Sequence, residues 1–122
     1  MVATPHIRED HPFPLDLIPE RHNDLQEALR DAGIEVEILT GGEVALSKLP
    51  DLDDEQLAAL CLGEGRSLLV ESPYTQASSL VEPALFHLRS RGFRPVLAHP
   101  ERSVAFLRDR ARLEALTEQG VA

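Results

Sequence analysis

The sequence predicts an α/β fold in which about four parallel β-strands alternate with helices. Strand-like apolar segments and helix-like segments follow one another along the 122 residues, without a low-complexity linker or a clear internal repeat. Three of the apolar segments, in residues 2–6, 38–43 and 95–102, also lead to a side chain that favours metal ions, which is His6, Glu43 or His99. Parallel strands joined by helices place their carboxyl ends on one face, where α/β proteins carry their chemistry.

The N-terminal part of the chain predicts one strand, one loop and one helix. Residues 1–4 are short and apolar, which favours a strand, and residues 7–19 contain three prolines, which favours a loop. Residues 20–32 are expected to form a helix that ends before Gly33, because a glycine commonly follows a helix C-terminus. The apolar side chains at helical spacing in this segment are Leu25, Ala28, Leu29 and Ala32.

The central part predicts two strands around a short helix. Residues 34–39 alternate between polar and apolar side chains and then lose the polar face, which favours a strand that ends at Gly41-Gly42. Asp53 is suited to cap a short helix. Residues 67–70 form an apolar run that is typical of a buried strand.

The C-terminal part predicts a helix, a strand and a further helical segment. Ser78 or Ser79 is suited to cap the first helix. Residues 94–98 are expected to form the fourth strand, and residues 104–119 one helix or two short helices divided near Asp109. This order implies a parallel sheet with right-handed crossovers.

Composition excludes several classes of function. Twelve basic residues against 21 acidic ones give a net charge of −9, which argues against a nucleic-acid or anionic-membrane surface. No apolar run approaches the about 18 residues of a membrane span, and the N-terminus lacks a signal-peptide layout. The single cysteine, Cys61, rules out an intrachain disulfide and fits a reducing compartment. We therefore expect a cytoplasmic protein with no nucleic-acid partner and no membrane insertion.

The candidate metal ligands are His6, Glu43 and His99, because each lies where an expected strand ends. Imidazole binds zinc, manganese or iron, and a carboxylate is able to bridge two cations. The alternatives are a turn histidine for His6 and a solvated turn glutamate for Glu43. Arg102 is a candidate phosphate ligand, because its planar guanidinium matches two phosphate oxygens. A salt bridge to Glu101 is the alternative role for Arg102.

Four other side chains have weaker claims to function. His11 lies in the proline-rich loop, where it either lines a pocket or is solvated. Glu71 follows a buried strand and is interpreted as a supporting partner or part of a structural ion pair. Tyr74 is interpreted as a packing residue. Cys61 lacks the surrounding phosphate-binding loop of cysteine-dependent phosphatases, so we do not expect a thiolate nucleophile.

Four short motifs carry a family resemblance over essentially the whole chain. They resemble motifs of the bacterial metal-dependent protein tyrosine phosphatases of the polymerase-and-histidinol-phosphatase (PHP) superfamily, CpsB/YwqE type. These enzymes accompany capsular and extracellular polysaccharide synthesis. The resemblance implies part of a (β/α)7 PHP-type barrel that binds divalent metal ions, often Mn²⁺. The motifs are Thr4-Pro5-His6, Gly41-Gly42-Glu43, Leu69-Val70-Glu71-Ser72-Pro73 and Ala98-His99-Pro100-Glu101-Arg102.

The same resemblance implies a reaction and the roles of four residues. His6, Glu43 and His99 would be metal ligands, with Glu43 bridging, and Arg102 would hold the phosphate as the catalytic arginine. Metal-activated water would hydrolyse phosphotyrosine, and the implied partner is the tyrosine-rich tail of a bacterial tyrosine kinase. The resemblance gives Glu101 no firm role.

The family's other metal ligands, a His-x-His pair on its first strand and a later Asp-x-His pair, have no counterpart in this sequence. We therefore expect residues 1–122 to form a single partial PHP-like domain, a central fragment that lacks the first strand and the C-terminal part of the barrel. Its activity would be impaired. Three alternatives are open: a non-catalytic fragment or pseudoenzyme, a PHP phosphoesterase for a small monoester such as histidinol phosphate, and self-association into a homo-oligomer.

Overall fold

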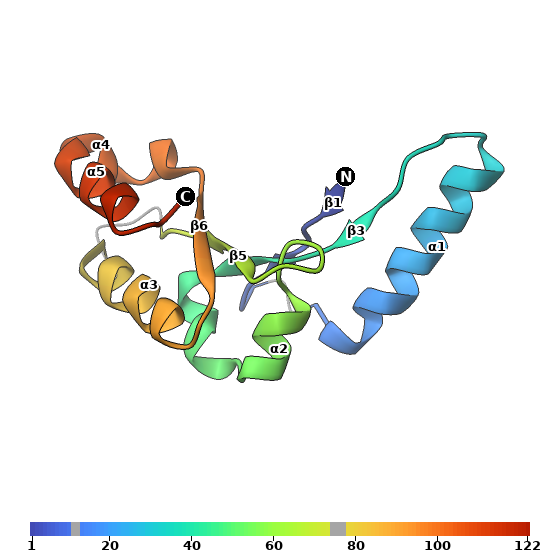
Figure 1. The fold of residues 1–122 in the computed structure, drawn as a ribbon, viewed down its shortest axis with the longest axis horizontal. Coiled ribbons are helices and arrows are strands. Elements are labelled where there is room, and N and C mark those ends of the chain that lie inside the picture. Colours follow the sequence, from blue (N-terminus) through green and yellow to red (C-terminus); the bar gives the residue numbers. More distant parts are fainter. Residues whose placement is uncertain (11–12, 74–77) are drawn as a thin grey trace.

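The computed structural model describes residues 1–10, 13–73 and 78–122 of the chain. Strands and helices alternate along it (Figure 1). The strands are β1 (Val2–Ala3), β2 (His6–Ile7), β3 (Leu39–Thr40), β4 (Glu43–Ala45), β5 (Ser67–Glu71) and β6 (Arg94–Ala98). The α-helices are α1 (Ile18–Asp31), α2 (Asp54–Ala59), α3 (Val81–Ser90), α4 (Val104–Arg108) and α5 (Arg110–Glu118). Short 3₁₀ helices are η1 (Leu15–Leu17), η2 (Leu46–Asp51), η3 (Ser78–Leu80) and η4 (Pro100–Arg102).

Parallel strands form the frame of the molecule. Four of them hydrogen-bond in the order β2-β4-β5-β6, and β1 pairs in parallel with β3. Only Thr4-Pro5 separates β1 from β2, and only Gly41-Gly42 separates β3 from β4. The smaller pair therefore leads into the larger sheet. The expected α/β class, with parallel strands alternating with helices, is confirmed.

The strand predicted at residues 34–39 is mostly wrong, because strand pairing begins only at Leu39. The side-chain amide of Gln26, on α1, donates to the carbonyl of Val36 at 2.9 Å. Its oxygen accepts from the backbone N–H of Ile38 at 2.9 Å. These bonds satisfy backbone groups that a neighbouring strand would otherwise take. The alternating pattern therefore marks an extended segment held against α1.

Three other boundaries differ from the expected ones. The loop predicted at residues 7–19 includes the end of β2, all of η1 and the first two residues of α1. Strand β3 ends at Thr40, before the glycine pair as expected, but a new strand, β4, begins directly after the pair with Glu43. Helix α3 begins at Val81, after η3, and its N-cap is Leu80, which makes no side-chain cap bond.

Two local signals are confirmed at the helix ends. The Asp53 carboxylate accepts from the backbone N–H of Gln56 at 2.8 Å, and the Gln56 side chain accepts from the backbone N–H of Asp53 at 3.0 Å. This reciprocal capping box fixes the start of α2. The division expected near Asp109 is also present, because α4 ends and α5 begins on either side of that residue.

The main hydrophobic core lies on one face of the larger sheet. Val44 of β4 and Val70 of β5 are neighbours in the register, and both are fully buried there. Helix residues such as Leu57 and Leu85 belong to the same core cluster. Because successive strand residues point to opposite faces, Glu43 and Glu71 lie on the other face of the sheet.

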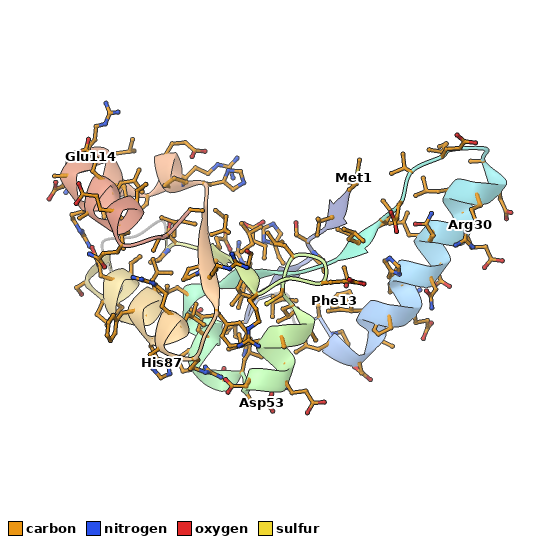
Figure 2. All side chains as sticks on the ribbon, viewed as in Figure 1. Met1, Phe13, Arg30, Asp53, His87 and Glu114 are labelled. Carbon is orange, nitrogen blue, oxygen red and sulfur yellow. The ribbon has the colours of Figure 1, made fainter. Side chains whose placement is uncertain are left out.

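The two ends of the molecule are built differently. Helix α1 projects away from the rest of the ribbon (Figure 1), and Figure 2 labels Arg30 near its far end, opposite Glu114 of α5. At the other end, Ala122 donates to the carbonyl of Pro95 and accepts from the N–H of Leu97, so this residue pairs with β6. Within the described ranges, no helix has the length and apolar character needed to cross a membrane.

Candidate metal centre

Three side chains from three neighbouring strands converge on one point. They are His6 of β2, Glu43 of β4 and Glu71 of β5, and one ligand atom from each lies within 4.8 Å of the others. The Nδ1 atom of His6 is 3.8 Å from an oxygen of Glu43 and 3.9 Å from an oxygen of Glu71. We call this group the three-strand cluster.

Strand register explains why these residues meet. His6 pairs directly with Glu43 across β2 and β4. Glu43 in turn pairs with Leu69 across β4 and β5, and Glu71 lies two residues beyond Leu69. Residues two apart in a strand share a face, so Glu71 points to the same side as Glu43, one step nearer the carboxyl end of the sheet.

The two carboxylates of the cluster are buried. Glu43 is 7% exposed and Glu71 is 5% exposed, while the His6 side chain is about half exposed. Among the described residues, the Oε1 atom of Glu43 has no hydrogen-bond partner. Buried charged groups are normally paired or bound to a metal ion. An orphaned carboxylate oxygen beside a second carboxylate and an imidazole therefore fits a divalent cation.

Arg8, the first residue after β2, contacts both the cluster and Asp10. Its guanidinium lies 3.6 Å from the Oε1 atom of Glu71. It also donates two hydrogen bonds to the carboxylate of Asp10, at 2.9 and 3.0 Å. The two bonds to Asp10 fix the plane of the guanidinium, which is therefore held at the edge of the cluster.

His99 follows the next strand of the sheet. It comes directly after Ala98, and Ala98 pairs with Glu71 across β5 and β6. His99 is not one of the three cluster residues; its Nδ1 atom lies 3.3 Å from the Oε1 atom of Glu101. Its backbone has φ 47° and ψ 51°, the only positive φ among the described non-glycine residues. Such a conformation costs about 1–3 kcal/mol and is common at functional sites.

Arg102 ends η4, three residues after His99, with an exposed side chain. Its backbone N–H donates to the carbonyl of His99 at 2.9 Å, which closes the turn after β6. The pKa of Glu101, between them, lies below its ordinary value because its own backbone N–H donates to the carboxylate, with a smaller contribution from His99. This turn therefore presents an imidazole, a carboxylate and a guanidinium to solvent.

The structure brings together two of the three predicted metal ligands and adds one. His6 and Glu43 lie in the three-strand cluster, and His99 lies at the end of the adjacent strand. Glu71, which the sequence presented only as a supporting partner, is a full member of the cluster. His11 and Tyr74 lie outside the described residues. Cys61 is buried just after α2, and burial raises the pKa of its thiol, so it presents no exposed nucleophile.

Comparisons with known proteins agree on one family. The family model described as "Capsular polysaccharide synthesis, CpsB/CapC" matches residues 1–122. Tyrosine-protein phosphatase YwqE of Bacillus subtilis (strain 168) is 26% identical over 126 residues, which covers 100% of this chain and 48% of YwqE.

A solved structure gives the same fold. It comes from work on YwqE of Bacillus subtilis and CpsB of Streptococcus pneumoniae, described as unique metal-dependent tyrosine phosphatases. It superposes with a TM-score of 0.80 and 24% identity over 98% of this chain and 49% of the solved one. The chain thus spans about half the length of the relatives it matches.

Proposed function

Because the chain belongs to the CpsB/CapC family of capsular polysaccharide synthesis, we propose that it carries part of the active site of a metal-dependent protein-tyrosine phosphatase. The single observation that carries this proposal is the three-strand cluster, in which two buried carboxylates and an imidazole converge. The proposed partner is a phosphotyrosine-bearing protein, such as the tail of a bacterial tyrosine kinase. The cytoplasmic location indicated by the single cysteine stays a prediction.

The cluster residues would hold the cation. His6, Glu43 and Glu71 supply one nitrogen and carboxylate oxygens, a donor set that suits Mn²⁺, which we propose as the metal. His99 would complete this set from the end of β6. A bound divalent cation supplies Lewis acidity, which lowers the pKa of water and polarises phosphoryl oxygens. The buried carboxylates, held by strand register, keep the ligand geometry fixed.

Arg102 would bind the phosphate. Its guanidinium is planar and permanently charged, so it matches two phosphoryl oxygens and offsets the charge that develops on them. The strained backbone of His99 supports a functional turn, because such strain persists only where the surrounding structure imposes it. We assign no catalytic role to Glu101.

This chain covers only about half the length of its relatives, which affects the activity that we expect of it. It matches 48% of YwqE, so we propose that residues 1–122 form a single partial PHP-like domain, with the first strand and the C-terminal part of the barrel lying outside it. The half-exposed His6 side chain leaves the cluster open to water, and charged groups stabilise a transition state less in water than in a dry site. Turnover by this chain alone is therefore expected to be slow.

The test measures hydrolysis and metal binding on the same chain. Hydrolysis of a phosphotyrosyl peptide should need Mn²⁺ and stop in excess EDTA. In calorimetric titrations with Mn²⁺, Glu71→Gln should weaken binding by about tenfold or more, because it removes a charged ligand. The matched control is Glu64→Gln, since Glu64 is an exposed carboxylate outside the cluster. Hydrolysis that survives EDTA, or Mn²⁺ binding unchanged in Glu71→Gln, contradicts the proposal.

Metal binding and the choice of phosphate ester distinguish two other functions. Mn²⁺ binding without any hydrolysis supports a non-catalytic fragment. Faster turnover of histidinol phosphate than of phosphotyrosine supports a phosphoesterase for small monoesters. Self-association stays a prediction, and sedimentation that shows a monomer at all concentrations contradicts it.

A further inference from the structure

A cavity of about 670 Å³ opens beside the three-strand cluster. It lies where β4 and β5 end, between η2 and the start of α3. Its walls are mainly apolar and come from Leu46, Pro50, Pro73, Leu80, Pro83 and Ala84. Ligand sites usually have volumes of about 300–1,000 Å³ and walls of this kind. The cavity therefore has the size and surface of a small-molecule site.

We propose that this cavity binds the aromatic ring of the phosphorylated tyrosine, and so selects aryl phosphates over alkyl phosphates. The inference rests on the proposed function, because it places the phosphate at the three-strand cluster. In an aryl phosphate the ring joins phosphorus through a single oxygen, so the ring must lie directly beside the phosphate. Glu71 belongs both to the cluster and to the cavity wall, which makes the two sites contiguous.

The charges at the cavity favour a neutral ring as its occupant. The described lining includes one cation, Arg8, and three carboxylates, Glu9, Asp10 and Glu71. An acidic side chain or a second phosphate placed there would meet net negative charge. Two hydrogen bonds to the Asp10 carboxylate fix the plane of the Arg8 guanidinium, and a guanidinium fixed in this way is suited to stack on an aromatic face. The apolar walls bury the remainder of the ring.

The cavity is also large enough for this occupant. A cavity of about 150 Å³ lined by apolar side chains is sufficient to bind benzene. Burial of an aromatic side chain strengthens binding by roughly 10- to 100-fold. We therefore expect the metal-loaded chain to bind benzylphosphonate, which resists hydrolysis, about 10- to 100-fold more tightly than ethylphosphonate.

Variants of α3 and η3 test whether the cavity causes this preference. Ala84→Phe should fill the cavity and reduce the preference for benzylphosphonate at least several-fold, with ethylphosphonate and Mn²⁺ binding unchanged. Leu80 is 63% exposed, so Leu80→Ala should not prevent folding. This variant should reduce the preference for benzylphosphonate by a smaller factor. Phe86→Trp is the matched control, because Phe86 lies on α3, is 68% exposed and does not line the cavity.

The outcomes separate this inference from the proposed function. Calorimetry with Mn²⁺ present measures the two phosphonates, and amide NMR with p-cresol probes the cavity without metal. Shifts of the Leu46 and Ala84 amides on adding p-cresol are expected. If Mn²⁺ binds but the two phosphonates bind equally and p-cresol causes no shifts, the cavity inference is wrong and the proposed function stands. If Mn²⁺ does not bind, the proposed function fails, and this inference fails with it.

Discussion

His99 adopts a left-handed backbone conformation, with φ 47° and ψ 51°, at the end of β6. For a residue with a Cβ atom this conformation costs about 1–2 kcal/mol, whereas glycine adopts it freely. His99→Gly and His99→Ala both remove the imidazole, but only glycine relieves the backbone strain. We expect His99→Gly to be more stable than His99→Ala by about 1 kcal/mol, after allowing for the extra freedom of glycine in the unfolded chain.

Urea denaturation of both variants in EDTA measures this difference without any contribution from metal binding. The contact between His99 and Glu101 is lost equally in the two variants, so it cancels. Equal stability of the two variants, or a more stable His99→Ala, would show that the backbone strain at this position does not exceed the unfolded-chain entropy that glycine adds, and would contradict the prediction.

Glu101 provides a titration test of the same turn. Its pKa lies below the ordinary value of 4.5, mainly because its own backbone N–H donates to the carboxylate, and secondly because of His99. A lowered pKa in the folded state stabilises the turn at pH values above 4.5, and this stabilisation is lost as the pH falls through the folded-state pKa. NMR titration of the Glu101 carboxyl should show that His99→Gln raises the pKa only part of the way to 4.5. A complete return to 4.5 would make His99 the dominant cause and contradict this assignment.

Gly42 shows why the glycine pair interrupts a strand. A Cβ atom at Gly42 would lie 2.6 Å from Cδ2 of Leu60, whose side chain is fully buried, and the Gly42 N–H donates to the Leu60 carbonyl at 3.0 Å. The absence of a side chain thus lets the end of α2 approach the strand immediately before Glu43. The close approach of the end of α2 to the backbone at Gly42, and not the need for a turn, therefore explains why a glycine occupies this position.

Gly42→Ala is therefore expected to lower the free energy of unfolding by about 1–3 kcal/mol, because the fully buried Leu60 side chain would have to shift within the core to make room for the added methyl group. Gly65→Ala is the matched control. A Cβ atom there would meet its nearest neighbour at 3.6 Å, an ordinary contact, and the backbone needs no positive φ. Chemical denaturation of both variants measures the difference. A Gly42→Ala protein as stable as Gly65→Ala would mean that Leu60 repacks freely.

Elements with local signals were predictable from the sequence, and elements that depend on distant partners were not. The Asp53 cap and the break at Asp109 depend on neighbouring residues and occur as expected. The alternation at residues 34–39 resembled a strand, but Gln26 of α1 takes up its backbone groups. Nothing in the local pattern distinguishes bonding to a helix side chain from bonding to a strand.

At the scale of the whole molecule, the same limit applies to the candidate site. His6 and Glu43 were predictable because their segments resemble strands that end at a functional group. Glu71 joins them only because β5 pairs with β4 in the register that places Leu69 opposite Glu43. A shift by one residue would turn Glu71 to the other face, and sequence spacing does not determine this register. The alternation of apolar Val70 and acidic Glu71 was the sequence signal that these two side chains lie on opposite faces of the sheet.

Cys61 reports on the stability of the whole fold. It is 1% exposed within the hydrophobic core cluster, and burial raises the pKa of its thiol, so the reactive thiolate forms chiefly when the chain unfolds. Native-state alkylation by iodoacetamide, followed by mass spectrometry, should therefore be at least a hundredfold slower than alkylation of the urea-unfolded chain at the same pH.

Because the three-strand cluster exists only in the folded sheet, Mn²⁺ should slow the alkylation of Cys61 further, and Glu71→Gln should abolish that extra protection. Alkylation at the unfolded rate under native conditions would mean that the core opens freely around Cys61, and protection by Mn²⁺ that persists in Glu71→Gln would place the cation elsewhere.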